Sequence, residues 1–201
     1  MALAQAALSP EGAVRPRDGA RARILDAAYD LFARHGIQAV GIDRIIAEAG
    51  VAKATLYHHF ASKAELVLAF LDLRAKRWTH DWLEAEVERL AEIPGERALA
   101  VFDVLDQWFR RPDFEGCSFI NTLLEIRDPA DPAHRASVLQ LDAIRAVLET
   151  YAQQAGAANP GEVGSQLQIL AMGAIVSARR GDLEAAQRAR ALAERLLNSS
   201  A

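Results

Sequence analysis

The sequence has one cysteine, no long apolar run and no strong excess of either charge. A single Cys117 among 201 residues excludes an internal disulfide framework and is typical of a reducing compartment. No stretch of 18 apolar residues occurs, and the first residues, MALAQAALSPEG, lack the basic start of a secretory signal peptide. We therefore expect a cytoplasmic protein with no membrane partner.

The sequence also lacks patterns for catalysis or metal binding. His58, His59, His80 and Cys117 do not have metal-ligand spacing, because adjacent histidines on a helix cannot both face one ion. No Ser/His/Asp or paired-carboxylate arrangement is apparent, so we expect no enzyme activity, metal or cofactor. An all-α enzyme or carrier remains the alternative. The neighbours of Cys117 supply no cation for a thiolate, which favours an inert thiol over a redox sensor.

The charges of the chain are unevenly distributed. The composition, 51% apolar and 25% charged, is ordinary for a globular protein, and the net charge is -4. Residues 15–77 carry eleven Lys and Arg against seven Asp and Glu, whereas residues 78–201 carry twelve against nineteen. A basic N-terminal third is typical of a nucleic-acid-binding region. Charge also fluctuates along any chain, so this pattern alone does not establish nucleic-acid binding.

The stretch IDRIIAEAGVAKATLYHHF, residues 42–60, predicts two short helices joined by a tight turn. Its first part has an apolar face at helical spacing, made of Ile42, Ile45, Ile46 and Ala49. Gly50 suits a left-handed helix end, and a second helix over 52–60 would bury Ala52, Leu56 and Phe60. This geometry predicts a helix-turn-helix, whose second helix can enter the DNA major groove.

The outward face of the second helix carries hydrogen-bond donors and no acid. Ala54, Thr55, Tyr57 and His58 point away from the buried side, and Lys53 and His59 lie at its borders. Such a face suits DNA bases and phosphates. Any helical hairpin in a bundle shows the same spacing, however, so the pattern by itself leaves a purely structural corner open.

The rest of the chain is helical by pattern and predicts an all-α fold. A first helix is expected around Ile24 to Phe32 and ends at Gly36, and Ser62 with Glu65 forms a capping box that starts a long helix reaching residue 77 or beyond. Breakers then divide the chain. Further helices are expected near 83–91, 95–110, 116–127, 133–155, 161–179 and 182–198.

Aromatic residues are concentrated after the long helix. An apolar pocket with a few polar groups is the usual form of a small-molecule site. A packed core explains the same residues equally well. The candidate ligand-binding residues are Trp78, Trp82, Phe102, Trp108, Phe109 and Phe119, with Cys117 and Asn121 as polar members.

The last two helices expose a broad face of small and large apolar residues. On the first of them lie Leu167, Leu170, Ala174 and Ile175, and Gly173 would permit close approach of another helix. Such a face favours packing against a second subunit, although packing within one chain would explain it too.

One stretch carries a specific family resemblance. GVAKATLYHHFASKAELVLAFLD resembles the recognition helix and the following helix of the tetracycline-repressor (TetR) family. RARILDAAYDLFARHG resembles the first helix of the family, and GCSFINTLLEIRD and the last two helices resemble later parts more loosely. The matching positions are Gly50, Val51, Lys53, Thr55, Leu56, Tyr57, His59, Phe60, Lys63 and Leu66.

The sequence departs from the family pattern at three positions, which lie at the starts of two helices. Ala52 stands where the family usually has a capping Ser, and Val40 and Gly41 stand where it usually has Thr or Ser. A lost N-cap hydroxyl costs about 0.5–2 kcal/mol. Asp43 or Gly41 is left to cap the first helix of the turn.

The resemblance implies a homodimeric repressor that binds a palindromic operator in double-stranded DNA. It implies a disordered arm over 1–18, a helix-turn-helix domain over 19–77 and a ligand-binding and dimerisation domain over 78–201. An apolar or aromatic effector would release the DNA; a ligand-independent DNA-binding protein is the alternative. By resemblance, bases would be read by Lys53, Ala54 and Thr55, phosphates would be bound by Arg44, Tyr57, His59 and Lys63, and His58 could do either.

Overall fold

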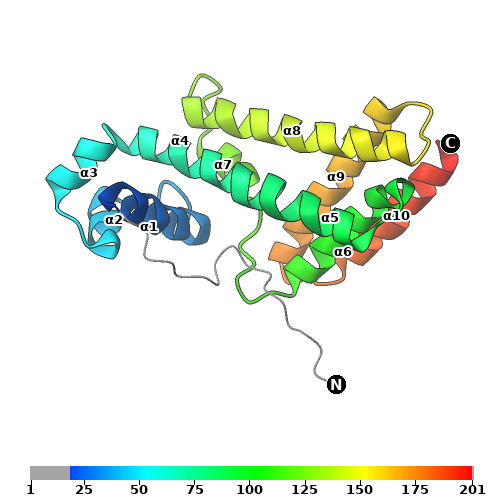
Figure 1. Cartoon of the computed structure of the whole chain (residues 1–201), viewed down its shortest axis with the longest axis horizontal. Coiled ribbons are helices and arrows are strands. Elements are labelled where there is room, and N and C mark those ends of the chain that lie inside the picture. Colours follow the sequence, from blue (N-terminus) through cyan, green and yellow to red (C-terminus); the bar gives the residue numbers. More distant parts are fainter. Residues whose placement is uncertain (1–18, 201) are drawn as a thin grey trace.

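The computed structural model describes residues 19–200, which are helical with no β-strand (Figure 1). The expected arm over 1–18 lies outside the described residues. The prediction of an all-α fold is confirmed. No helix among residues 19–200 is long and apolar enough to cross a membrane. The elements are α1 (Ala20–His35), α2 (Ile42–Ala49), α3 (Lys53–His59), α4 (Lys63–Arg74), η1 (Ala75–Glu84), α5 (Ala85–Leu90), η2 (Pro94–Glu96), α6 (Arg97–Phe109), α7 (Ser118–Glu125), α8 (Pro132–Gln154), α9 (Pro160–Arg179) and α10 (Ala185–Ser199).

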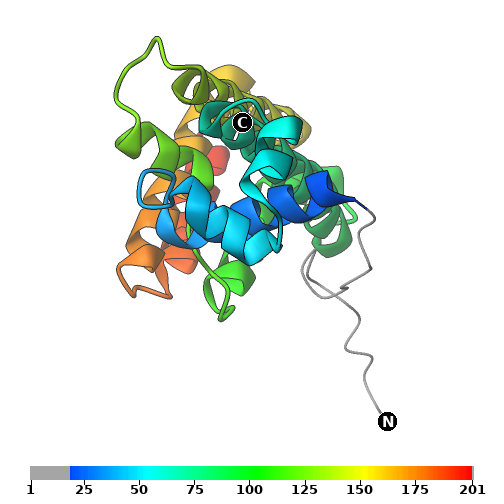
Figure 2. The ribbon, with the colours of Figure 1, turned by 90° about the vertical axis from the view of Figure 1, so that its left-hand side faces the viewer.

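Helices α1, α2 and α3 form a small bundle at one end of the molecule (Figures 1 and 2). The expected apolar faces meet in its centre, where Ile24, Phe32, Ile45 and Leu56 are almost fully buried. Burial of such side chains contributes roughly 1.5–3 kcal/mol each, which makes this a genuine core despite its size. The N-terminal domain therefore has its own packed centre.

A continuous helical rod runs from this bundle into the rest of the molecule. The predicted capping box starts it: the Glu65 N–H donates to Ser62 Oγ at 3.1 Å, and Glu65 Oε2 accepts from the Ala61 N–H at 2.7 Å. The prediction of a separate helix over 83–91 is wrong, because α4, η1 and α5 follow one another without a break to Leu90. No Gly or Pro interrupts residues 63–90, and the middle of the rod widens into the π-helix η1 instead.

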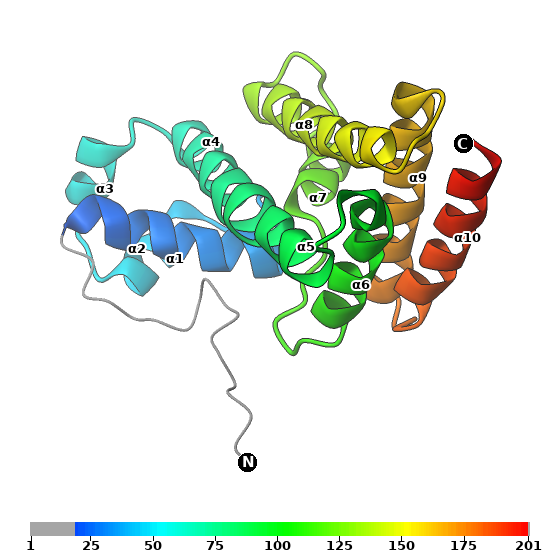
Figure 3. The same ribbon diagram turned by 45° about the vertical axis from the view of Figure 1, so that its right-hand side comes forward.

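Helices α6 and α8 pack against the rod, and α9 and α10 lie beyond them at the outer end of the molecule (Figure 3). The other expected helices lie within three residues of the observed ones. The largest shift is at α10, which begins at Ala185 because Asp182 is used in the preceding turn, where its carboxylate accepts from the Glu184 N–H at 3.2 Å.

Gly164, rather than Gly173, is the glycine that lets two helices approach within the chain. A Cβ added at Gly164 would lie 2.8 Å from the backbone nitrogen of Glu149 on α8, whereas a Cβ at Gly173 would meet nothing within 4 Å. Both residues lie on α9. Close packing of α8 on α9 therefore requires glycine at 164, and Gly173 faces open space.

Candidate nucleic-acid interface and ligand cavity

The turn between α2 and α3 has the geometry that the glycine predicts. Gly50 adopts φ 61° and ψ 44°, a left-handed conformation that glycine reaches without steric cost. The Gly50 N–H donates to the Ala47 carbonyl at 3.3 Å and the Val51 N–H to the Ile46 carbonyl at 3.3 Å. These bonds satisfy the last carbonyls of α2 and fix the angle at which α3 leaves.

Neither helix of the pair has a side-chain cap. Gly41 and Ala52 occupy the N-cap positions of α2 and α3, both in extended conformation and without a capping side-chain bond. Asp43 lies in the first turn of α2 and accepts from Lys53 Nζ at 3.3 Å. The expectation that Ala52 is buried is wrong: it precedes the first helical turn and is exposed, so the helical spacing does not reach it.

One face of α3 is open to solvent. Leu56 and Phe60 anchor its opposite side at 0% and 1% exposure. On the outer side Lys53, Ala54, Tyr57 and His58 are exposed, and Thr55 and His59 are half-buried. The six candidate residues on α3 therefore lie on or beside one accessible surface, as the periodicity predicts.

The two candidate phosphate contacts outside α3 differ from each other. Arg44 is exposed on α2, and its guanidinium lies 2.8 Å from His35 Nε2. Lys63 is half-buried, and its ammonium donates to the Ile37 carbonyl at 2.6 Å. Burial lowers the pKa of Lys63, opposed by the charge of Glu125. Lys63 thus binds inward in this structure, which the sequence pattern did not indicate.

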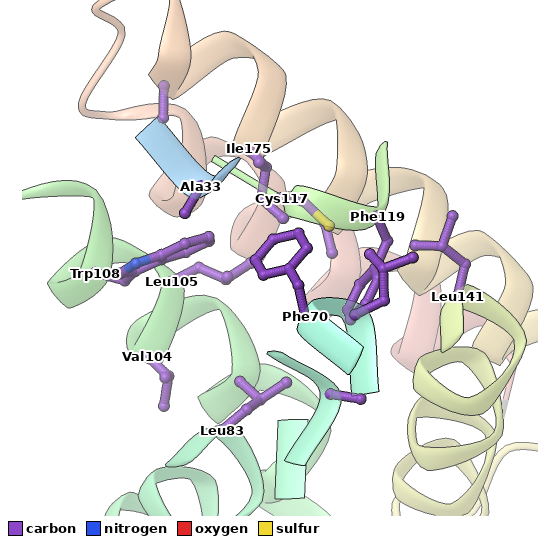
Figure 4. Close-up of a cluster of buried hydrophobic side chains, with 14 of the residues drawn as sticks. Ala33, Phe70, Leu83, Val104, Leu105, Trp108, Cys117, Phe119, Leu141 and Ile175 are labelled. Atoms are coloured by element: carbon purple, nitrogen blue, oxygen red, sulfur yellow. The ribbon is translucent and has the colours of Figure 1, made fainter. Parts of the chain in front are cut away.

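An apolar cavity lies beside the rod in the C-terminal domain. The cavity has a volume of about 40 Å³, which is room for only a few water molecules. Figure 4 shows Leu105, Cys117, Leu141 and Ile175 in the surrounding apolar cluster. The lining residues are Trp78, Thr79, Leu83, Val101, Leu105, Cys117, Ile120, Leu141, Ile144, Val147, Leu148, Tyr151, Gln168, Ala171, Met172 and Ile175.

The eight candidate ligand-binding residues are distributed over several places. Trp78 and Cys117 line the cavity. Trp82 and Trp108 line a neighbouring polar pocket with Arg74, Arg77 and Arg111, and Asn121 lines a surface pocket beside Arg179. Phe102, Phe109 and Phe119 are buried in the core. The aromatic cluster is mainly tightly packed tilted rings, in which the Trp78 and Trp108 ring centroids are 5.0 Å apart with an angle of 56° between the ring planes.

Sequence reasoning missed most of the cavity. Its walls are largely aliphatic side chains of α6, α8 and α9, together with Thr79, Tyr151 and Gln168. Apolar positions on three helices carry no local signal that distinguishes a cavity wall from a filled core. Buried atoms without a hydrogen-bond partner provide a signal only after folding, as for the Trp78 indole nitrogen and the Thr79 hydroxyl.

Comparison with known proteins places the whole chain. Residues 24–70 match the sequence model of the family described as bacterial regulatory proteins, tetR family. The fold is similar to the crystal structure of SCO4454, a TetR-family transcriptional regulator from Streptomyces coelicolor, with a TM-score of 0.81 and 33% identity over 90% of this chain and 95% of that one. The chain belongs to the TetR family of transcriptional regulators. The family and domain order expected from the sequence are confirmed.

Curated TetR-family relatives match over shorter stretches. The activator FasR from Mycolicibacterium smegmatis is 50% identical over 56 residues, and the repressor SCO4008 from Streptomyces coelicolor is 43% identical over 60 residues. These matches cover 28% and 30% of this chain, and 26% and 31% of the lengths of the two relatives. The chain is similar to both an activator and a repressor. The similarity therefore establishes a transcriptional regulator but does not distinguish repression from activation.

Besides the Arg34–Glu115 ion pair at 3.2 Å, two sets of contacts join the bundle of α1, α2 and α3 to the rod and to α7 in this TetR-family regulator. At the rod, Arg74 donates to the Tyr29 hydroxyl at 2.8 Å, and Arg77 pairs with Asp26 at 3.2 Å. At α7, Glu125 accepts from the Gln38 N–H at 2.8 Å. The Gln38 side-chain amide donates to the Glu125 carbonyl at 2.6 Å. Both sets tie the DNA-binding bundle to segments that also line the cavity.

Proposed function

We propose that the protein is a homodimeric repressor that binds a palindromic operator through α3 and leaves it when a small molecule enters the cavity. The observation that carries this proposal is the open α3 face, in a TetR-family chain whose helical rod also walls an apolar cavity. In this reading residues 19–77 form the DNA-binding domain and residues 78–201 bind the effector and the second subunit. The continuous rod crosses the boundary between them.

The apolar face that the sequence predicted for a second subunit is wrong, because Leu167, Ala174 and Ile175 are buried within the chain. The exposed side of α9 supports a symmetric dimer instead. Ile169, Gly173 and Val176 follow one another at helical spacing on one stripe, and Ile169 and Val176 are 69% and 55% exposed. Leu192 on α10 is also half exposed. Apolar side chains gathered on a surface stripe favour a protein contact, and a two-fold interface uses the same stripe twice. The open space over Gly173 lets a partner helix come close.

Release follows from the narrowness of the cavity. An effector much larger than the open space must displace the surrounding helices, including the rod, so it favours a second arrangement of the two domains. The contacts of Arg74 and Arg77 with α1 would then carry that displacement to the DNA-binding bundle. By linkage, DNA weakens effector binding by the same factor by which the effector weakens DNA binding.

The contact roles that we propose on DNA are those that the family resemblance implies, except at Lys63. Lys53, Ala54 and Thr55, at the first turn of α3, face base edges. Arg44, Tyr57 and His59 face phosphates, and His58 lies between the two groups. Lys63 was expected at a phosphate, but its bond to the Ile37 carbonyl favours a role in holding the loop before α2.

The test is selection of bound sequences from a random DNA pool with the full-length protein. We expect enrichment of a palindrome whose half-sites lie about one helical turn apart. A pool without enrichment would contradict the proposal and favour an all-α enzyme or carrier. Placing the selected site within a promoter of a reporter then decides the sign: repression is expected, and stimulation would make the protein an activator. A ligand-independent binder would hold the site in the presence of every cavity-binding compound.

A further inference from the structure

The hydroxyl of Thr79 is a buried polar group without a partner at the wall of the cavity. Thr79 is 1% exposed and lines the cavity, and no hydrogen-bond partner for its oxygen is found within residues 19–200. Unpaired buried hydroxyls destabilise a fold and are uncommon in native structures. The Trp78 indole nitrogen is also unpaired, but Trp78 lines the neighbouring pocket as well and so does not indicate one direction.

The π-helix explains why this hydroxyl is unpaired. A threonine in an α-helix can donate to the carbonyl four residues earlier. Thr122 does so to Ser118 at 2.8 Å, and Thr150 to Ala146 at 3.0 Å. Thr79 lies in η1, where the backbone bonds reach five residues back and the turn is wider. In this wider turn the usual internal bond is not made, and the Thr79 hydroxyl stays buried without a partner on a residue that lines the cavity.

The cavity wall carries no charge. None of the described residues that line it is acidic or basic. Burial raises the pKa of Tyr151 to about 12 and also raises the pKa of the Cys117 thiol, so both groups stay neutral at physiological pH. A charged guest would lose its hydration without meeting an opposite charge, which is strongly unfavourable.

The same segment contacts the DNA-binding bundle. Arg77, two residues before Thr79, pairs with Asp26 of α1. Arg74, the last residue of α4, donates a hydrogen bond to the Tyr29 hydroxyl of α1. The open space holds only a few waters at about 10–15 Å³ each, so a guest that bonds Thr79 must shift the η1 wall. The residue that would bind the guest and the arginines that contact the DNA-binding bundle thus lie close together on the same helical segment.

We propose that the effector is an uncharged, largely apolar molecule with one hydrogen-bonding group, and that Thr79 is the residue that binds this group. The inference rests on the proposed function, since it assigns the chemistry of the effector. Thr79 then determines which apolar molecules are selected, while the aliphatic walls contribute affinity without discrimination between polar groups.

Two fluorescent probes with the same ring skeleton test the charge requirement. N-phenyl-1-naphthylamine is neutral with one N–H, and 8-anilinonaphthalene-1-sulfonate adds a negative charge. We expect the full-length protein to bind the neutral probe at least about tenfold more tightly than the sulfonate, because no cation lines the cavity. Equal affinities, tighter binding of the sulfonate, or no binding of the neutral probe would overturn the inference.

Three variants test the role of Thr79. Thr79→Val removes the unpaired hydroxyl, so it should weaken the neutral probe about two- to tenfold. It should also raise the midpoint of thermal unfolding without ligand by about 2–4 °C. Thr79→Ser should restore probe affinity. Thr122→Val is the matched control: it removes an equally buried hydroxyl that has a partner, so it should lower the midpoint and leave probe binding unchanged.

The outcomes separate this inference from the proposed function. If Thr79→Val lowers the unfolding midpoint as Thr122→Val does, or leaves probe affinity unchanged, Thr79 is not the anchoring residue, even where the wild type still selects a palindrome. If the wild type selects no DNA sequence, the repressor proposal fails, whatever the probes show. Tighter probe binding by Thr79→Val would also overturn the inference.

Discussion

Helix α3 presents its candidate DNA contacts on an open surface, whereas the cavity in the C-terminal domain is nearly closed. Tyr57 on α3 is 44% exposed, and Leu105 and Leu148 on the cavity wall are 2% exposed. A surface that is already accessible can bind without rearrangement, but a closed cavity must open for its ligand. Under the proposed function, DNA can therefore bind α3 without rearrangement, whereas an effector must rearrange the C-terminal half.

Under the proposed function the α3 surface binds a palindrome only in a dimer, so the largest expected effect comes from removing the second subunit. Gly173→Arg places a bulky charge on the apolar stripe of α9, so we expect a monomer at low micromolar concentration and loss of operator binding. Sedimentation and DNA binding measure the two effects. Gly173→Ala is the control and should stay dimeric. A fully dimeric arginine variant would show that the interface lies elsewhere.

The closed half can be loosened at the contact between α8 and α9. Gly164→Ala forces a Cβ to within 2.8 Å of the Glu149 backbone, and we expect the free energy of unfolding to fall by about 1–3 kcal/mol. Gly161→Ala is the control on the same helix: its Cβ would meet only the Asn159 side-chain oxygen at 3.9 Å, so it should be neutral or slightly stabilising. Denaturant unfolding of the two variants at one protein concentration measures the difference. Equal stability would mean that α8 and α9 are less closely packed than described.

The open half separates into base contacts and phosphate contacts. Thr55→Val keeps the shape but removes the hydroxyl, so it should change preference at one base position per half-site by about 1–3 kcal/mol with an unchanged salt dependence. Arg44→Ala should weaken all sequences alike and reduce the slope of log K against log salt by roughly 2 for a dimer. Binding to operator and random DNA at several salt concentrations measures both.

Lys63→Ala provides the contrast to Arg44→Ala. Its ammonium binds the Ile37 carbonyl, so we expect lower stability of the N-terminal bundle and little change in the salt slope. A slope reduced as much as in Arg44→Ala would show that Lys63 turns outward and binds phosphate, as the family resemblance implies.

The two halves also differ in how far the sequence predicts them. The turn at Gly50 and the apolar stripe of α2 are local patterns, and local patterns determine short helices and their faces. The cavity is made where three helices meet, and no local pattern distinguishes Leu105 on its wall from Phe102 in the core. Gly164 and Gly173 illustrate the same limit: both lie on α9, and only packing shows which one faces α8.

The π-helix is the second feature that the sequence could not predict. Residues 75–84 contain no Gly or Pro to mark a change of helix type. From the sequence, the stretch WTHDW could be either the last turn of the long helix or the start of the next one. Nothing in it indicates a change of helix type. The widened turn arises where Trp78 packs against Trp108 from α6, a contact between residues thirty positions apart.

The smallest expected effect concerns the contact that links the open half to the closed half. Glu125 lies on α7 with Ile120, which lines the cavity, and its carboxylate accepts the Gln38 N–H beside α2. If this contact stabilises the DNA-competent arrangement, Glu125→Ala removes a hydrogen bond worth about 0.5–1.5 kcal/mol from that state only. Operator affinity should then fall about two- to tenfold. Effector affinity without DNA should rise, because both changes follow from a shift of the population toward the arrangement that binds the effector.

Asp142→Ala is the control for this prediction, because it removes an exposed carboxylate paired with Arg145 on α8, away from the contact between the domains. It should change neither affinity. Titrations of operator DNA and of a cavity-binding probe with both variants measure the coupling. A Glu125→Ala protein that loses operator affinity without gaining probe affinity would indicate local damage to the DNA-binding bundle. Unchanged affinities would leave the rod, through Arg74 and Arg77, or the Arg34–Glu115 ion pair as the connection that carries the signal.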